Sequence, residues 1–167
     1  MNSAIHRGRT VGCPFANCGR FFVSTAALVL HLEGGRCASG VDRQQVNRYV
    51  RQIDKKNVIT DPSRLLTGGS EHVEKKWIAT EASWNGYSYE CYLCHSGFKS
   101  LAVLNTHLAS PRHQDKIYVC PAPECRIKFS VLSGLCQHIE SEKCGVSKFK
   151  QVRETMDMIS NFGRLTF

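Results

Sequence analysis

One spacing pattern, C-x3-F-x5-L-x2-H, occurs three times in this sequence without an insertion. Its three copies are Cys18, Phe22, Leu28 and His31; Cys94, Phe98, Leu104 and His107; and Cys125, Phe129, Leu135 and His138. Self-similarity of this kind indicates repeated supersecondary units. In a chain of 167 residues, the repeat constrains the fold more than any feature of composition.

Each copy extends into four Cys and His residues, the ligand types that zinc prefers in a tetrahedral site. The first and third sets follow C-x4-C-x12-H-x5-C, whereas the second follows C-x2-C-x12-H-x5-H. Two Cys on a tight turn would supply two thiolates, and a helix would supply the following imidazole. We therefore expect one zinc ion per set. The candidate ligands are Cys13, Cys18, His31 and Cys37; Cys91, Cys94, His107 and His113; and Cys120, Cys125, His138 and Cys144.

The fold class follows from the small size of each repeat. Units below about 40 residues rarely fold on apolar burial alone, so metal must supply much of the folding free energy. The predicted fold is small metal-bound α+β: three ββα zinc fingers with an inter-finger helix and a C-terminal helix. The predicted boundaries are 10–40 for finger 1, 41–86 for the linker region, 87–116 for finger 2, 117–145 for finger 3, and 146–167 for the C-terminal helix and tail.

The nine Cys could instead form disulfides, and the compartment decides between disulfides and metal. The first 20 residues hold no apolar run that could serve as a signal-peptide core, and an odd number of Cys cannot pair completely. No stretch approaches the roughly 20 apolar residues of a membrane span. We therefore expect an intracellular protein that is not secreted, without a membrane segment, whose clustered Cys bind metal.

These ligand sets resemble those of C2H2-type zinc-finger proteins, with fingers 1 and 3 in the variant form that has Cys as its last ligand. The segments NTHLASPRHQDKIYVCP and LCQHIESEKCG are also similar to uncharacterised fungal multi-finger proteins. The C2H2 resemblance implies DNA binding, a role in transcription regulation and a nuclear location. The QDKIY connector between fingers 2 and 3 departs from the family's TGEKP-like linker, which puts the family's groove-following spacing in question.

The linker region carries a clear helix signal. Asp42 and Gln45 are spaced as a capping box, and apolar residues follow at i, i+3, i+4 and i+7 from Val46, which predicts a helix over about 43–56. The basic residues on its other face are Arg48, Arg51 and Lys55. They either contact nucleic-acid phosphates or form the solvated face of an amphipathic helix.

Other segments between and after the fingers have weaker signals. Residues 58–76 are expected to form a loop. Asn85-Gly86 between two aromatic residues predicts a hairpin with strands at about 77–83 and 87–91. Apolar residues at helical spacing predict a helix over about 148–161, and its apolar stripe is expected to be a packing surface.

Four Cys and His residues fall outside the ligand sets. Cys136 is expected to be an ordinary residue of the third finger helix, with a regulatory thiol as the alternative. The backbone should turn His95 away from the metal, and His6 and His72 are expected at the surface. Four protein ligands saturate each zinc, and the chain has no H-E-x-x-H, G-x-S-x-G or phosphate-cradling Gly loop. We therefore expect no enzyme activity.

The formal net charge is +8, or about +6 once eight thiolates and three Zn²⁺ ions are counted, and it favours an anionic partner. Helix positions −1, 3 and 6 read bases in the usual finger. Among those positions only Gln137 is a residue type suited to reading a base, so phosphate contacts would supply most of the affinity. The other candidate contacts, besides the 43–56 helix, are Arg112, Lys116, Arg126 and Lys128.

Three partner classes remain open, and DNA is the favoured one. Apolar helix positions at Ala27, Leu30 and Val103 suit a protein groove, which makes a protein–protein interaction module an alternative. Double-stranded RNA is a further alternative, because the H-x5-H spacing of finger 2 is similar to that of RNA-binding finger families. RNA duplexes are read largely by shape. The sequence leaves the oligomeric state open.

Overall fold

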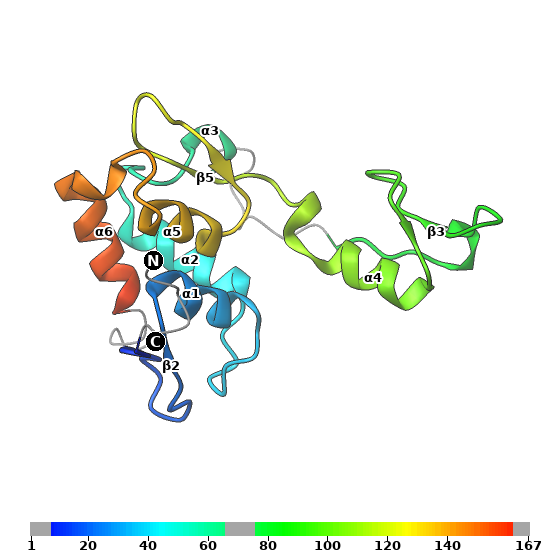
Figure 1. Ribbon diagram of the computed structural model, residues 1–167, viewed down its shortest axis with the longest axis horizontal. Coiled ribbons are helices and arrows are strands. Elements are labelled where there is room, and N and C mark those ends of the chain that lie inside the picture. Colours follow the sequence, from blue (N-terminus) through cyan, green and yellow to red (C-terminus); the bar gives the residue numbers. More distant parts are fainter. Residues whose placement is uncertain (1–7, 66–75, 162–167) are drawn as a thin grey trace. The chain divides into compact units, whose positions relative to one another are not determined.

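Three ββα units are the repeated elements of the structure, a computed structural model that describes residues 8–65 and 76–161, without the side chains of residues 64 and 65 (Figure 1). His6 and His72 lie outside the described residues. In each unit two short strands pair antiparallel and a nine-residue helix follows. The elements are β1 Val11–Gly12, β2 Phe21–Phe22 and α1 Thr25–Glu33; β3 Tyr89–Glu90, β4 Gly97–Phe98 and α4 Leu101–Ala109; and β5 Tyr118–Val119, β6 Lys128–Phe129 and α5 Leu132–Glu140. The predicted fold class is confirmed.

The finger helices differ in how they begin. Ser24 and Ser100 are the N-caps of α1 and α4, and each side chain accepts a hydrogen bond from the backbone N–H three residues later. Such caps satisfy one of the amides that a helix start leaves without an intrahelical partner. The equivalent residue of α5 is Val131, which makes no side-chain cap. Helix α5 therefore needs an acceptor from elsewhere in the chain.

The linker helix α2, Arg43–Ile53, begins with the expected capping box between Asp42 and Gln45. It ends three residues before the predicted position. The cause is Asp54, whose buried carboxylate accepts hydrogen bonds from the backbone N–H groups of residues 58, 59 and 60 and from the Thr60 hydroxyl. These bonds turn the chain back after α2.

The segment after α2 was expected to be a loop but is partly ordered as an extended strand-like stretch. The Val119 N–H donates to the Ile59 carbonyl, and the Asp61 N–H donates to the Ile117 carbonyl, so the stretch lies along the strand of finger 3. A short helix, α3 Pro62–Leu65, follows. Ile59 and Thr60 are buried, which explains why the chain is held there.

The strand predicted at about 77–83 is wrong. Residues 81–83 form a short 3₁₀ helix, η2 Glu81–Ser83, and only Trp84 bridges to Tyr89 across the Asn85-Gly86 turn. The segment before η2 is held by Asn105 of α4 instead. Its side-chain oxygen accepts from the Ala79 N–H at 2.8 Å, and its amide donates to the Ala79 carbonyl at 3.2 Å. This side chain supplies the hydrogen bonds that a strand partner would have made.

The chain divides into two compact units. Unit 1 comprises Met1–Gly69 and Lys116–Phe167, and it contains fingers 1 and 3; unit 2, Ser70–Asp115, contains finger 2. Each unit has a core of its own, and the core of unit 2 is built on buried Leu104 and Leu108. Among the described residues, no helix is both long and apolar enough to cross a membrane. Fingers 1 and 3 therefore form one body although finger 2 separates them in the sequence.

The core of unit 1 lies between the two finger helices, α1 and α5, which pack directly on each other (Figure 1). Leu28 and Leu32 of α1 and Leu135 and Ile139 of α5 are almost completely buried. Helix α2 and the C-terminal helix α6, Lys150–Ser160, add their apolar faces to this core. The predicted packing role of the C-terminal helix is thus observed, and its bounds lie within the predicted 148–161.

Unit 1 contains the same module twice. In both copies an 11-residue helix, α2 or α6, begins six residues after the last candidate ligand, Cys37 or Cys144. A short 3₁₀ turn, η4 Val146–Lys148, precedes α6. The two modules also bond to each other, because the Tyr49 hydroxyl donates to the Met158 carbonyl at 2.9 Å. Each module is therefore a finger plus a following helix, and the two pack as a pair.

Two glutamates, one from each finger helix, accept hydrogen bonds from the start of the other helix. The Glu33 carboxylate, at the end of α1, accepts hydrogen bonds from the N–H groups of Leu132 and Ser133 at 2.7 and 3.2 Å. The Glu140 carboxylate, at the end of α5, accepts from the Ala26 N–H at 3.0 Å. A carboxylate at a helix N-terminus also interacts favourably with the helix dipole. Each finger helix thus caps the start of the other, and α5 gains the acceptor that Val131 does not supply.

We predict that Glu33→Ala destabilises unit 1 by about 1–2 kcal/mol, because two amides at the start of α5 lose their acceptor. Urea unfolding of the zinc-loaded protein, followed by circular dichroism, measures this change. Glu124→Ala removes an exposed carboxylate of finger 3 and is the matched control, expected to leave the transition unchanged. Equal transitions for the two variants would contradict the capping role of Glu33.

Candidate metal centres

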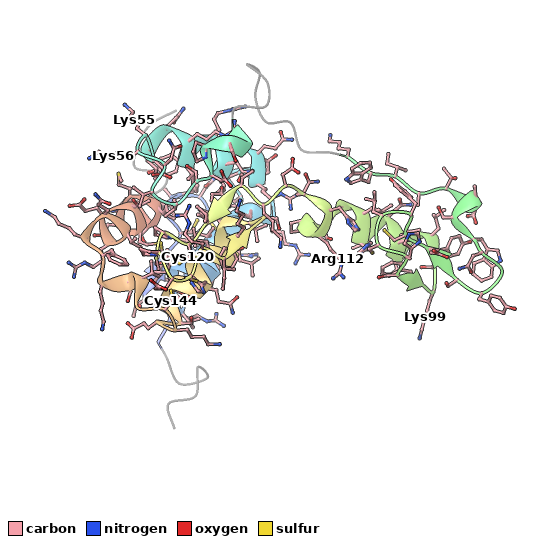
Figure 2. The ribbon with its side chains drawn as sticks, turned by 90° about the horizontal axis from the view of Figure 1, so that it is seen from above. Lys55, Lys56, Lys99, Arg112, Cys120 and Cys144 are labelled. Atoms are coloured by element: carbon pink, nitrogen blue, oxygen red, sulfur yellow. The ribbon has the colours of Figure 1, made fainter. Side chains whose placement is uncertain are left out.

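The structure brings the twelve candidate ligands into three groups of four, matching the sets assigned from spacing. Within each group all ligand atoms lie within 4.8 Å of one another. In finger 3, Cys120 follows β5 and Cys144 follows α5, and the two side chains lie close together (Figure 2). Residues up to 24 positions apart in sequence thus converge on one point in each finger.

The spacing of the ligand atoms fits tetrahedral zinc. Bonds of about 2.3 Å to sulfur and about 2.0 Å to nitrogen place two sulfurs about 3.8 Å apart, and a sulfur and a nitrogen about 3.5 Å apart. The Sγ–Sγ distance is 3.7 Å both for Cys13–Cys37 and for Cys120–Cys144. The Sγ–Nε2 distances from Cys18, Cys94 and Cys125 to the following finger His are 3.4, 3.5 and 3.4 Å. The three groups are therefore positioned to hold zinc ions.

The repeated Phe fixes the orientation of the helix His in each finger. The ring centroids lie 4.9 Å apart for Phe22–His31, 4.6 Å for Phe98–His107 and 5.4 Å for Phe129–His138. In every finger Nε2 is the imidazole atom that faces the Cys side chains. The Phe of the shared sequence pattern is thus a positioning residue for a ligand as well as part of the finger core.

Backbone amides stabilise the charge of the thiolates. The sulfur of a Cys ligand accepts a hydrogen bond from the backbone N–H two residues later in the chain. Ser96 donates in this way to Cys94, and Ile127 donates to Cys125. The Ser96 hydroxyl and amide lower the pKa of Cys94 to about 7. Hydrogen bonds to the ionised form favour that form. The backbone around the first two Cys residues of a finger is therefore arranged for thiolate ligands.

Burial has the opposite effect on the first Cys of fingers 1 and 3. It raises the pKa of Cys13 and of Cys120 to about 12, and the neighbouring thiols of each group add to the shift. Burial also lowers the pKa of His31 and His107, which keeps these imidazoles neutral as metal ligands. Because their pKa values are raised, the Cys13 and Cys120 thiols keep their protons near neutral pH until a bound cation displaces those protons. Zinc binding at these sites must therefore release protons.

The last ligand requires each helix to end early, because five intervening residues would rotate it off the ligand face of a continuous helix. In finger 1, Gly35 adopts a left-handed φ of +64°. In finger 2, the 3₁₀ turn η3, Pro111–His113, follows Ser110. In finger 3, Glu142 occupies the position equivalent to Gly35 and also has a positive φ of 55°. Finger 3 thus makes the same turn without glycine.

The remaining Cys and His residues of the described chain stay outside the metal groups. Cys136 is fully buried beside Met156, and burial raises its pKa, so it is a core residue of α5. His95 has a left-handed φ of 57° and pairs with Glu90 at 2.8 Å. Both observations agree with the roles expected from the sequence.

The predicted nucleic-acid contacts are spread over several elements. Arg112 belongs to unit 2, and the other seven belong to unit 1. Lys128 pairs with Asp61 at 2.7 Å. Arg51 is half-buried, and its Nε and Nη2 are shielded from solvent and have no hydrogen-bond partner within residues 8–65 and 76–161. The exposed members of the set are Arg48, Lys55, Arg112, Lys116, Arg126, Lys128 and Gln137. Arg51 is thus the candidate least accessible to a phosphate.

Comparison with known proteins supports the assignment of finger 2. Residues 89–113 match the family model zf-met, described as a zinc-finger of C2H2 type. The match begins at β3 and ends at the ligand His113, so it covers the second metal group and its scaffold. Comparison with curated proteins and with solved structures gives no match, so the similarity to fungal multi-finger proteins rests on the sequence alone.

Sequence reasoning missed the residues that pair fingers 1 and 3. Glu33 and Glu140 each stand two residues after the helix His, whereas finger 2 has Ala109 in that place. The matching C-x4-C spacing and the final Cys also distinguish fingers 1 and 3 from finger 2. These shared differences were the available signal, because a repeat that stands alone has no need of the residues that join two other repeats.

We predict that loss of one zinc site affects the two units differently. Cys144→Ala should weaken zinc binding in finger 3 and also in finger 1, because the two fingers share one core; His107→Ala should remove zinc only from finger 2. Elemental analysis after challenge with a chelator, together with amide NMR spectra, measures this. If Cys144→Ala releases no more than a single zinc and finger 1 keeps its native spectrum, fingers 1 and 3 fold independently.

Proposed function

We propose that this zinc-finger protein binds nucleic acid through unit 1, mainly by contacts to phosphates. The observation that carries the proposal is the uneven distribution of charge. Unit 1 contains eighteen Lys and Arg against nine Asp and Glu, a formal charge of +9, whereas unit 2 contains four against five, a charge of −1. Two zinc sites with three thiolates each reduce the charge of unit 1 to about +7. The whole excess of basic residues therefore lies in one compact body.

Much of the acidic charge of unit 1 is already used inside the unit. Asp54 bonds to the backbone after α2, Asp61 pairs with Lys128, and Glu33 and Glu140 cap the finger helices. Basic side chains such as Lys55 and Lys56 project from the turn after α2 (Figure 2). An excess of exposed basic charge of this kind attracts the phosphate backbone and makes binding dependent on salt.

The packing of the finger helices supports phosphate contacts rather than base reading by fingers 1 and 3. A pair of packed helices is roughly 20 Å across, whereas the major groove of B-DNA is about 12 Å wide. Helices α1 and α5 therefore cannot enter one groove together. Their reading positions are mostly small or apolar, and Gln137 alone among them suits a base edge. Binding through this body would depend weakly on sequence.

DNA is the duplex that we propose first, with a role as a nuclear transcription regulator, because the chain resembles C2H2-type zinc-finger proteins. The H-x5-H spacing of finger 2 keeps double-stranded RNA as the alternative duplex. We also propose that the zinc ions have a structural role and that the protein is not an enzyme. The support for this is the saturation of each site by four protein ligands.

We predict that the Lys55→Glu/Lys56→Glu double variant binds random-sequence duplex DNA more weakly than the wild type. Loss of two phosphate contacts should also reduce the salt dependence, with the slope of log K against log salt smaller by about 2. Fluorescence anisotropy of zinc-loaded protein at several salt concentrations measures both quantities. Duplex RNA of equal length, titrated in parallel, distinguishes the two kinds of duplex.

The matched control is Lys76→Glu/Lys99→Glu, which makes the same change of charge on exposed residues of unit 2. Its effect should be smaller, because unit 2 carries no excess of basic residues. Equal losses in the two double variants would show that net charge alone matters. Absence of binding to either duplex near physiological salt would reject the proposed function.

A further inference from the structure

Finger 1 exposes an apolar face. Phe21 and Val23 on and beside β2 are 57% and 40% exposed, and Leu30 of α1 is 63% exposed. A groove of about 740 Å³ runs along this side of the finger. Its lining residues are Arg9, Gly19, Arg20, Phe21, Phe22, Val23 and Ala27. Leu30 lies one helical turn beyond Ala27 and extends the same face.

The zinc-finger scaffold does not require an apolar face at these positions. In finger 3, whose ligands and backbone correspond residue by residue, the places of Phe21, Val23 and Leu30 are taken by polar residues. Those residues are Lys128, Ser130 and Gln137. Two copies of one fold within one unit therefore differ in the character of their outer face. An exposed apolar surface that the fold does not need is typical of a binding site.

The charge around the groove indicates the chemistry of its occupant. Arg9 and Arg20 are both exposed at the groove, and among the described residues no acidic side chain lines it. A nucleic acid would pair with the arginines but would leave the apolar side chains without a partner. A peptide with apolar anchors and acidic neighbours would satisfy both, because apolar side chains can fill the groove while carboxylates pair with guanidinium groups.

We propose that this face of finger 1, formed by Arg9, Arg20, Phe21, Val23, Ala27 and Leu30, binds a segment of a partner protein that carries large apolar residues flanked by Asp or Glu. The site is separate from the phosphate contacts proposed for unit 1. It gives fingers 1 and 3 different tasks: finger 1 carries the protein-binding face, whereas finger 3 has Lys128, Ser130 and Gln137 in place of Phe21, Val23 and Leu30, and exposed Ile127 in place of Arg20.

The test is selection of random peptides, displayed on phage, against the immobilised zinc-loaded full chain. Enriched peptides should combine large apolar residues with acidic ones. Leu30→Glu should weaken their binding by about tenfold or more, as expected for loss of a central apolar contact. Arg20→Glu should also weaken the binding of the acidic peptides, because it replaces a guanidinium group with a carboxylate. Because Leu30 is exposed, its replacement should leave the zinc content and the unfolding transition unchanged.

Gln137→Glu is the matched control, since it introduces the same carboxylate at the equivalent position of finger 3 and should leave peptide binding intact. The proposal is overturned if no peptides are enriched, if they are basic, or if they bind Leu30→Glu as well as wild type. Conversion of a wild-type dimer to a monomer by Leu30→Glu in sedimentation would instead identify a second copy of the chain as the occupant. Peptide binding only after deletion of residues 1–7 would identify the chain's own N-terminal segment as the occupant, and would also overturn the proposal.

Discussion

Metal coordination is the constraint on which the rest of this structure depends. Each finger has two-residue strands and one short helix, and such a unit cannot bury enough apolar surface to fold alone. Four ligands closing on one zinc ion contribute apparent binding free energies of about 10–16 kcal/mol in zinc-finger peptides, and this energy is available for folding. The Phe beside each helix His shows how the small core and the ligand set are built from the same few residues.

Pairing of fingers 1 and 3 adds a second level of organisation to these metal sites. Helices α1 and α5 bury their apolar faces against each other, and Glu33 and Glu140 satisfy amides at the opposite helix starts. The same module, a finger followed by an 11-residue helix, therefore occurs twice in one core. Finger 2 has neither glutamate and holds its own upstream segment through Asn105. It therefore lacks the caps that join fingers 1 and 3, in agreement with its place in a separate unit.

The parts of the fold that could be predicted are those encoded by local spacing. The twelve candidate ligands, the capping box of α2 and the apolar stripe of α6 all follow from short-range patterns. The strand expected at 77–83 failed because Asn105, more than 20 residues away, supplies its hydrogen bonds. The pairing of fingers 1 and 3 was missed for a similar reason. Val131 and Glu33 are separated by nearly 100 residues, and propensity alone gives no sign that one compensates for the other.

Fingers 1 and 3 differ most in the chemistry of the residues that neither bind metal nor enter the core. Zinc fixes the backbone of each finger so firmly that the outer positions of β2 and α1 can change without affecting the fold. Finger 3 uses the equivalent positions for Lys128, which pairs with Asp61, and for exposed Gln137. Finger 1 places Phe21 and Leu30 there and leaves them exposed. Because the two scaffolds are otherwise alike, the exposure of Phe21 and Leu30 does not follow from the fold of a finger, and this supports the partner contact proposed for finger 1.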